Sequence, residues 1–294
     1  MTLGSGVFVG LVGMLTATTF LQTPTWGATI RDDQSGSSYL TLASNRDYDS
    51  VGMFVNSWGY TGCATLIAPD WILTAAHSLA AANSGTFTIN GNSYASSQFV
   101  THPSWNGNAF NGYDLALVRL NSPVVGVAPA VLYTGSSEFG QAATYVGFGF
   151  TGTGLTGWRS LDNQKRAFQN MTDGDFGNPS VLLGSDFDNP HTVADNAFGD
   201  AIALTLEGCV APGDSGGGVF LTFGSQSYLA GVISFVAASD GNANADYGDV
   251  SGFGRISPFV PWIASTVPEP SASVLLAAAG LGVLLKRPFR RVGK

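Results

Sequence analysis

Short apolar runs separated by polar turns dominate the chain between residues 50 and 257. The runs are about four to eight residues long, and clusters of Gly, Asn, Asp and Ser divide them. Runs of this length and spacing are typical of β-strands, which we expect at 50–56, 64–68, 71–76, 115–120, 143–148, 218–222 and 229–235. The pattern predicts an all-β, antiparallel fold, arranged either as two barrels or as a sandwich.

A helical period appears only towards the end of this body. Val260, Ile263 and Ala264 would share one face of a short helix over residues 258–266. Segments 106–112 and 240–252 are rich in Gly, Asn and Asp, and we expect them to be surface loops.

The N-terminal segment has the pattern of a secretory signal. Residues 7–21 are mostly apolar, and Pro24 and the small residues Gly27 and Ala28 follow them. No Lys or Arg precedes the apolar run, and a buried helix or strand is the alternative interpretation. We expect residues 1–28 to be a signal peptide.

The C-terminal segment has three parts. The sequence VPEPS is followed by an apolar run over 272–285 and then by the basic cluster KRPFRR. The run is shorter than the roughly 20 residues that span a bilayer, so a marginal span and a buried helix both fit. The order of the parts resembles the PEP-CTERM sorting signals of Gram-negative envelope proteins. That resemblance implies that an exosortase-like enzyme processes 266–294, with transient membrane contact through 272–285, and that a signal peptidase removes the other end. We therefore expect an exported protein, in the cell envelope or outside the cell.

Composition and charge exclude several classes of protein. The chain of 294 residues is 45% hydrophobic and 11% charged, which disfavours disorder. Residues 29–267 contain seven Lys and Arg against nineteen Asp and Glu, so this acidic body would repel nucleic acid. Two cysteines are too few for a disulfide-dense scaffold or a four-thiolate zinc site. We expect neither a metal nor a cofactor.

Three short segments carry candidate chemistry. WILTAAH ends an apolar run with His77, DLALVRL begins one with Asp114, and GDSGG surrounds Ser215 with glycines. Amide hydrolysis by serine needs a base at the hydroxyl, an acid that holds the base, and donors for the oxyanion. Each segment alone also has an ordinary interpretation as a strand end, a turn or a cap. Chance explains their joint occurrence poorly.

TAAH, DLAL and GDSGG in this order resemble the chymotrypsin/trypsin-like serine peptidases of the S1 family. Further similar segments are CATLIA, THPS, YVGFG, GVISF and FVPWI, from about residue 51 to 263. The resemblance implies two antiparallel six-stranded β-barrels, at about 50–125 and 126–257, with a short helix at 258–265. These would form a peptidase domain over 29–265, acting on protein or peptide substrates.

The resemblance also implies roles for individual residues. Ser215 would be the nucleophile, His77 the general base and then the acid, and Asp114 the group that orients His77. The backbone N–H groups of Gly213 and Ser215 would form the oxyanion hole. Ser234 would hydrogen-bond Asp114 and face the substrate backbone. His102 and His191 have no such context and are expected in loops.

The cysteines depart from the family pattern. The family commonly bridges a cysteine before the TAAH segment to one after the histidine, but here Cys63 is present and Ser78 follows His77. Cys209 fits the spacing before the nucleophile, yet its usual partner loop, 237–252, has no cysteine. The sequence is compatible with two alternatives, a Cys63–Cys209 disulfide bond and two free buried thiols.

Activation and specificity are open as well. In the family a new N-terminal amine pairs with the acid before the nucleophile, here Asp214. Thr29 would supply that amine if the signal is cut after Ala28, and another partner for Asp214 is the alternative. Glu207 at the base of the specificity pocket would favour Arg or Lys. An ungapped alignment places Cys209 there instead, and Val236 at the pocket mouth favours small or medium apolar residues, the preference that we expect.

Two other functions compete with the peptidase. A catalytically inactive protein of the same fold would serve as an envelope or extracellular-matrix binding protein, although the intact set His77, Asp114 and Ser215 argues against it. A purely structural surface protein would leave GDSGG and TAAH unexplained.

Overall fold

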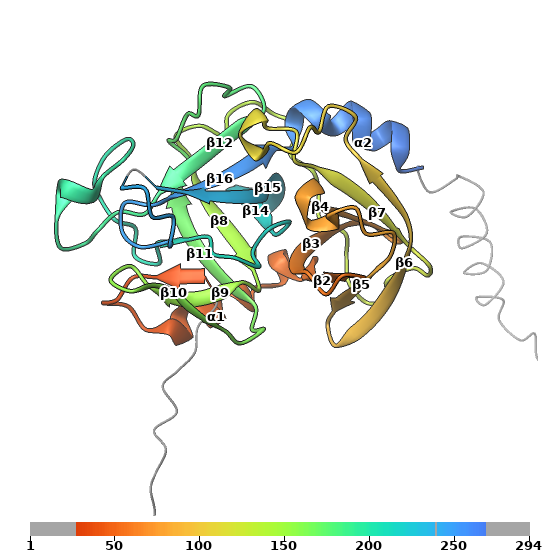
Figure 1. The fold of residues 1–294 in the computed structure, drawn as a ribbon, viewed down its shortest axis with the longest axis horizontal. Coiled ribbons are helices and arrows are strands. Elements are labelled where there is room, and N and C mark those ends of the chain that lie inside the picture. The colour runs from red at the N-terminus through yellow and green to blue at the C-terminus, as the bar shows by residue number, and fades with distance from the viewer. Residues whose placement is uncertain (1–27, 239, 269–294) are drawn as a thin grey trace, which may run out of the picture.

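Six strands between residues 51 and 120 close into an antiparallel barrel, drawn in orange to yellow in Figure 1. The computed structural model describes residues 28–238 and 240–268. The order around the barrel is β2-β3-β4-β7-β6-β5. The strands are β2 (Val51–Asn56), β3 (Thr61–Ala68), β4 (Trp71–Thr74), β5 (Gly85–Ile89), β6 (Asn92–Thr101) and β7 (Ala116–Leu120). Alternate residues point inward, and the barrel core contains the fully buried side chains of Phe54, Leu66, Ile72, Phe87 and Val118.

The second unit is a six-stranded sheet that curves into a half-barrel. Its order is β11-β8-β14-β15-β16-β12, with every neighbouring pair antiparallel. The strands are β8 (Ala142–Gly147), β11 (Arg166–Met171), β12 (Leu182–Asp186), β14 (Gly218–Phe223), β15 (Gln226–Ala237) and β16 (Val250–Arg255). The prediction that the second unit is a closed barrel is therefore wrong, although its six antiparallel strands are present. A single bridge, between Gly174 and Gly184, takes the place of a ladder between the two edges.

A smaller sheet of four strands accompanies the half-barrel. It has the order β10-β9-β1-β13, formed by β1 (Ala28–Ile30), β9 (Phe150–Thr153), β10 (Gly157–Leu161) and β13 (Gly208–Cys209). β1 runs parallel to β9 and antiparallel to β13. The fold is thus antiparallel except at this one pairing of the described strands.

Two α-helices lie outside the sheets (Figure 1). α2 (Val260–Thr266) follows a 3-10 turn, Ser257–Phe259, and confirms the short C-terminal helix. α1 (Gly36–Ala43) was not expected from the sequence; it buries Tyr39 and Ala43, and it packs near β11. Its eight residues give too little periodicity to distinguish it from a loop.

The loop expected over 240–252 ends earlier than predicted, because β16 begins at Val250. Segment 106–112 contains one 3-10 turn, Ala109–Asn111. The predicted signal peptide and sorting segment fall almost wholly within 1–27 and 269–294, outside the described residues. None of the helices in the described part of the chain is long and apolar enough to cross a membrane.

The two β units share a core, which fixes how they sit against each other. Leu73 and Leu117 of the barrel belong to one buried cluster with Val146, Phe220 and Val232 of the half-barrel. The ends of β4 and β7 and the turns of the half-barrel therefore meet along a dry interface, and the three candidate segments lie at this junction.

Candidate active site

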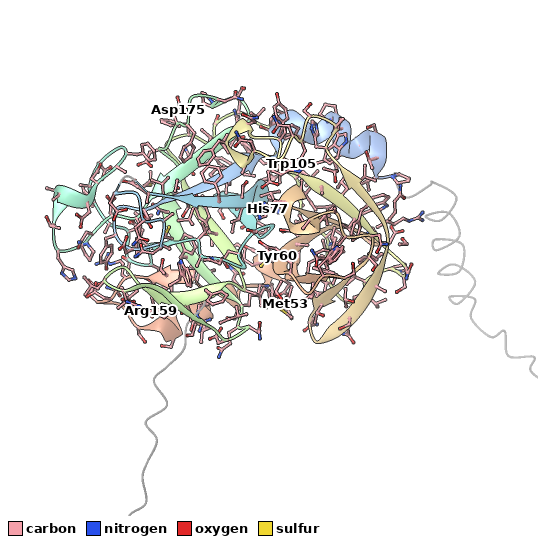
Figure 2. The ribbon with its side chains drawn as sticks, viewed as in Figure 1. Met53, Tyr60, His77, Trp105, Arg159 and Asp175 are labelled. Atoms are coloured by element: carbon pink, nitrogen blue, oxygen red, sulfur yellow. The ribbon has the colours of Figure 1, made fainter. Side chains whose placement is uncertain are left out.

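His77 lies on a short 3-10 helix, Ala76–Leu79, that begins two residues after β4 ends. Figure 2 shows it between the two β units, with Tyr60 nearby. The rings of Tyr60 and His77 meet edge to face with centroids 6.3 Å apart. All four residues of β4 are buried in the closed barrel, so the position of His77 is set by a rigid element.

Asp114 lies two residues before β7 and is almost completely buried. Its Oδ1 accepts the backbone N–H of His77 at 2.8 Å, and its Oδ2 contacts His77 Nδ1 at 2.6 Å. Ser234 Oγ donates to the same Oδ2 at 2.5 Å. A carboxylate can only accept, so His77 Nδ1 carries the proton, and Nε2 keeps its lone pair free for the solvent side.

Ser215 lies in a glycine-rich turn between β13 and β14. Gly216 has φ +85°, and a Cβ there would lie 2.1 Å from the Cys63 carbonyl oxygen and 2.2 Å from Thr74 Oγ1. Glycine is therefore required where the turn packs against the strand end that leads to His77. Within the described residues, no hydrogen bond joins the Ser215 hydroxyl to His77. Such bonds are often long without substrate.

The peptide units that precede Gly213 and Ser215 are each held in one orientation by a hydrogen bond to their carbonyl oxygen. The Pro212 carbonyl accepts from Phe150 N–H at 2.7 Å, and the Asp214 carbonyl accepts from Gly217 N–H at 2.8 Å. In a trans peptide the N–H points opposite to the carbonyl, so the N–H groups of Gly213 and Ser215 point the other way. Among the described residues neither N–H has an acceptor, which suits both to bind an oxyanion.

Asp214 is buried behind this turn. Its Oδ1 accepts from Gly149 N–H at 2.7 Å and its Oδ2 from Ala211 N–H at 2.9 Å. Burial raises the pKa of this carboxyl to about 6, while the two N–H bonds and the charge of Arg166 act in the opposite direction. Thr29 is paired with Cys209 in the small sheet, and in the uncut chain the partners of Asp214 are backbone amides.

Comparison with known proteins identifies the family to which this chain belongs. Residues 43–263, most of the chain, match the family model named Trypsin. The chain belongs to the trypsin family of serine peptidases. It is 30% identical over 230 residues to chymotrypsin-like elastase family member 1 of Macaca fascicularis, which covers 72% of this chain and 80% of that protein. The Bos taurus and Rattus norvegicus proteins of the same name are 30% and 29% identical over 231 and 228 residues, with the same coverage.

The structure corrects the position assigned to Cys63 in this trypsin-family site. A side chain at Gly62 would meet Ser78 Oγ at 3.3 Å, so Gly62 is the residue that faces Ser78. Side chains alternate along β3, and Cys63 points instead towards Gly213 and Phe148. Ser78 Oγ is buried and has no hydrogen-bond partner among the described residues.

Both cysteines are free and buried, so the Cys63–Cys209 bond is absent from the structure. Cys63 Sγ donates to the Gly213 carbonyl at 3.1 Å, whereas Cys209 Sγ accepts from Ser251 Oγ at 3.3 Å. Cys63 lies on β3 of the barrel, whereas Cys209 lies on β13 of the small sheet.

The residues predicted to face the substrate differ in their surroundings. Glu207 is buried, and its two oxygens accept the backbone N–H groups of Asp188 and Leu204. Burial raises the pKa of Glu207 to about 8. Val236 pairs with Ser251 on β16 and is partly exposed. The carboxyl group of Glu207 thus binds the backbone of the loops around it.

Sequence reasoning missed one residue that holds His77. Asn56, at the end of β2, donates through Nδ2 to the Ser78 carbonyl at 2.9 Å and accepts through Oδ1 from the N–H groups of Trp58 and Tyr60. It is buried, unlike most asparagines at strand ends. Its only signal in the sequence was a polar residue that closes an apolar run.

The two other histidines have separate partners. His102 packs against Tyr113, Phe259 and Trp262, and His191 pairs with Asp32. In the part of the chain that the structure describes, no group of His, Cys, Asp and Glu side chains could hold a metal ion.

Proposed function

We propose that this chain is an exported serine endopeptidase that cleaves peptide bonds through His77, Asp114 and Ser215. The observation that carries the proposal is the carboxylate of Asp114. It binds both the backbone and the ring of His77, beside a serine turn whose two N–H groups are free. A binding protein of the same fold would have no need for this combination.

The reaction follows from the proton positions. Ser215 Oγ attacks the carbonyl carbon of the scissile bond while His77 Nε2 takes the hydroxyl proton, and Asp114 stabilises the resulting imidazolium. The carbonyl oxygen becomes an oxyanion and accepts from Gly213 and Ser215 N–H. The proton on Nε2 then passes to the leaving amine, which departs and leaves an acyl-enzyme. Water, deprotonated by His77, releases the acid product and restores Ser215.

The preferred residue before the scissile bond is small or medium and apolar. Val236 is a branched, partly exposed side chain next to Phe235 on β15. Glu207 already accepts two backbone hydrogen bonds, which leaves it poorly suited to hold an Arg or Lys of the substrate. The relatives named as elastases are consistent with a preference for small residues.

The two terminal segments of the chain direct this enzyme to its place outside the cytoplasm. A signal peptidase removes the segment up to Ala28, and an exosortase-like enzyme acts on the segment from 266 onward. The membrane contact through 272–285 is transient, so the enzyme works in the envelope or outside the cell. No metal or cofactor takes part.

The test is hydrolysis of a mixed peptide library by the purified chain, with mass spectrometry of the products. We expect internal cleavage after small or medium apolar residues, and none with Ser215→Ala or His77→Ala. Equal cleavage by wild type and both variants, which would come from a contaminant, would refute the proposal, and so would intact peptides in all samples.

A further inference from the structure

Three successive backbone N–H groups, from residues 148 to 150, donate to the turn around Ser215 and its support. Phe148 N–H donates to Cys63 Sγ at 3.2 Å, Gly149 N–H to Asp214 Oδ1 at 2.7 Å, and Phe150 N–H to the Pro212 carbonyl at 2.7 Å. The segment leads from β8 into β9, so it is held at both ends by sheets.

Cys63 joins this segment to the oxyanion turn. Its thiol accepts from Phe148 and donates to the Gly213 carbonyl at 3.1 Å, and its own N–H donates to the Ser215 carbonyl at 2.8 Å. Thr74 Oγ1 in turn donates to the Cys63 carbonyl at 2.7 Å. Cys63 is fully buried, so water does not compete for any of these bonds.

Gly213 is therefore held on both sides. The peptide before it is fixed through Pro212 by Phe150, and the peptide after it is fixed by Cys63 Sγ and by the Asp214 N–H bond to Ala211, 3.0 Å long. Gly213 has φ +94°, a conformation that other residues rarely adopt. Turning its N–H away from an oxyanion requires breaking the Phe150 bond, which the bridge through Cys63 resists.

We propose that Cys63 is a positioning residue for the oxyanion hole, and that it forms with residues 148–150 an internal clamp that makes a newly cut N-terminal amine unnecessary. The inference rests on the proposed function. Both oxygens of Asp214 have amide donors in the uncut chain, so this carboxyl is already held without a terminal amine.

The first test separates transition-state from ground-state effects. Cys63→Ala removes the bridge, and we expect kcat on a peptide substrate to fall about 10- to 100-fold while KM stays within about twofold, because oxyanion donors act in the transition state. Cys63→Ser keeps a donor and an acceptor and restores kcat to within about fivefold of wild type.

Val118→Ala is the matched control, since it removes buried volume from the barrel core, a cluster that contains none of residues 213–217. It should lower the unfolding temperature without changing kcat. A Cys63→Ala kcat equal to wild type, or a loss of kcat shared by Cys63→Ala and Val118→Ala, would overturn the role of Cys63. If Cys63→Ala does not fold, Cys63→Val, which fills the site but can neither donate nor accept, takes its place: a reduced kcat with an unchanged KM is expected, and unchanged values of both refute the role of Cys63.

The second test addresses the amine. A recognition site for a cysteine protease is placed directly before Thr29 in the full chain, so that cleavage leaves Thr29 as the first residue, and a fluorophosphonate probe is added before and after cleavage there. We expect labelling rates within about threefold of each other, since the oxyanion donors are held internally. A rise of about 100-fold or more on cleavage would overturn the inference and leave the peptidase intact. No labelling in either state would instead refute the proposed function.

Discussion

The side-chain amide of Asn56 donates to the carbonyl oxygen of Ser78 at 2.9 Å, and a weaker contact of 3.4 Å reaches the carbonyl of Leu79. These carbonyls belong to the last turn of the helix that carries His77, which has too few residues to satisfy them itself. The end of β2 therefore helps to determine where His77, the proposed general base, lies.

Asn56→Ala should disturb the site and the fold together. It leaves buried donors and acceptors unpaired in two loops, and we expect a loss of about 2–3 kcal/mol in the free energy of unfolding. The rate of peptide hydrolysis should fall further than stability alone predicts at a temperature where the variant is fully folded. Urea unfolding and initial rates measure the two effects. Asn92→Ala, which removes an exposed contact to Asn90, should change neither.

Ser234→Ala should lower kcat with little change in fold. The hydroxyl donates to the Oδ2 of Asp114 that also holds His77 Nδ1, so its loss leaves a buried charge less well solvated. We expect kcat/KM to fall about tenfold, the equivalent of 1.36 kcal/mol. Ser185→Ala is the control, because Ser185 bonds the buried Tyr145 hydroxyl in the half-barrel. Equal kcat/KM in the two variants would contradict the role of Ser234.

The strands that carry the site were predictable because their apolar runs have the length that is typical of β-strands. β4 lies in an apolar run that ends next to His77, and β7 lies in one that begins next to Asp114. The local pattern of apolar residues is sufficient to identify both strands. The glycines around Ser215 likewise indicate a turn that packs closely against its surroundings.

Features that depend on distant pairings were not predictable. Cys63 and Gly62 are neighbours in sequence, and which of them faces Ser78 is decided by the register of β3 against β2 and by the turn of Ser215. A shift of one residue exchanges the two faces of a strand. The open edge of the half-barrel and the parallel pairing of β1 with β9 are also decided by tertiary contacts, since neither strand contains a signal for its partner.

The fold should be more stable at mildly acidic pH than at pH 8. Among the described residues, burial raises the pKa of Asp186 and of five further carboxyl groups: Asp173 and Asp214 to about 6, Asp188 and Asp249 to about 7, and Glu207 to about 8. Between about pH 4 and pH 8 the folded chain then binds more protons at these groups than the unfolded chain does. The free energy of unfolding must fall as pH rises through this range.

Urea unfolding at pH 5 and pH 8 checks this, with a higher midpoint expected at pH 5. His102 and Lys165, whose pKa values burial lowers (that of Lys165 to about 8), act in the opposite direction, but they are two groups against six carboxyls. Glu207→Gln removes one of the six carboxyls and should reduce the difference between the two pH values. A midpoint that rises from pH 5 to pH 8 in wild type would contradict the assignment.

Reducing agents should leave the enzyme unchanged. Cys63 and Cys209 are free, and burial raises the pKa of both thiols, so neither forms a thiolate readily. We expect equal unfolding temperatures and equal activity with and without dithiothreitol. A thiol reagent should modify both cysteines only in denaturant. Loss of stability on reduction would reveal a disulfide and contradict the structure.

The central claim is that Ser215 is a nucleophile activated by His77 and supported by the Gly213 and Ser215 N–H groups. The most direct measurement is covalent labelling of the purified protein with a fluorophosphonate, followed by mass spectrometry to locate the modified residue. The account predicts one adduct on Ser215 in wild type, and none in Ser215→Ala or His77→Ala. Folded wild-type protein that stays unlabelled, or an adduct that persists in Ser215→Ala, would contradict it.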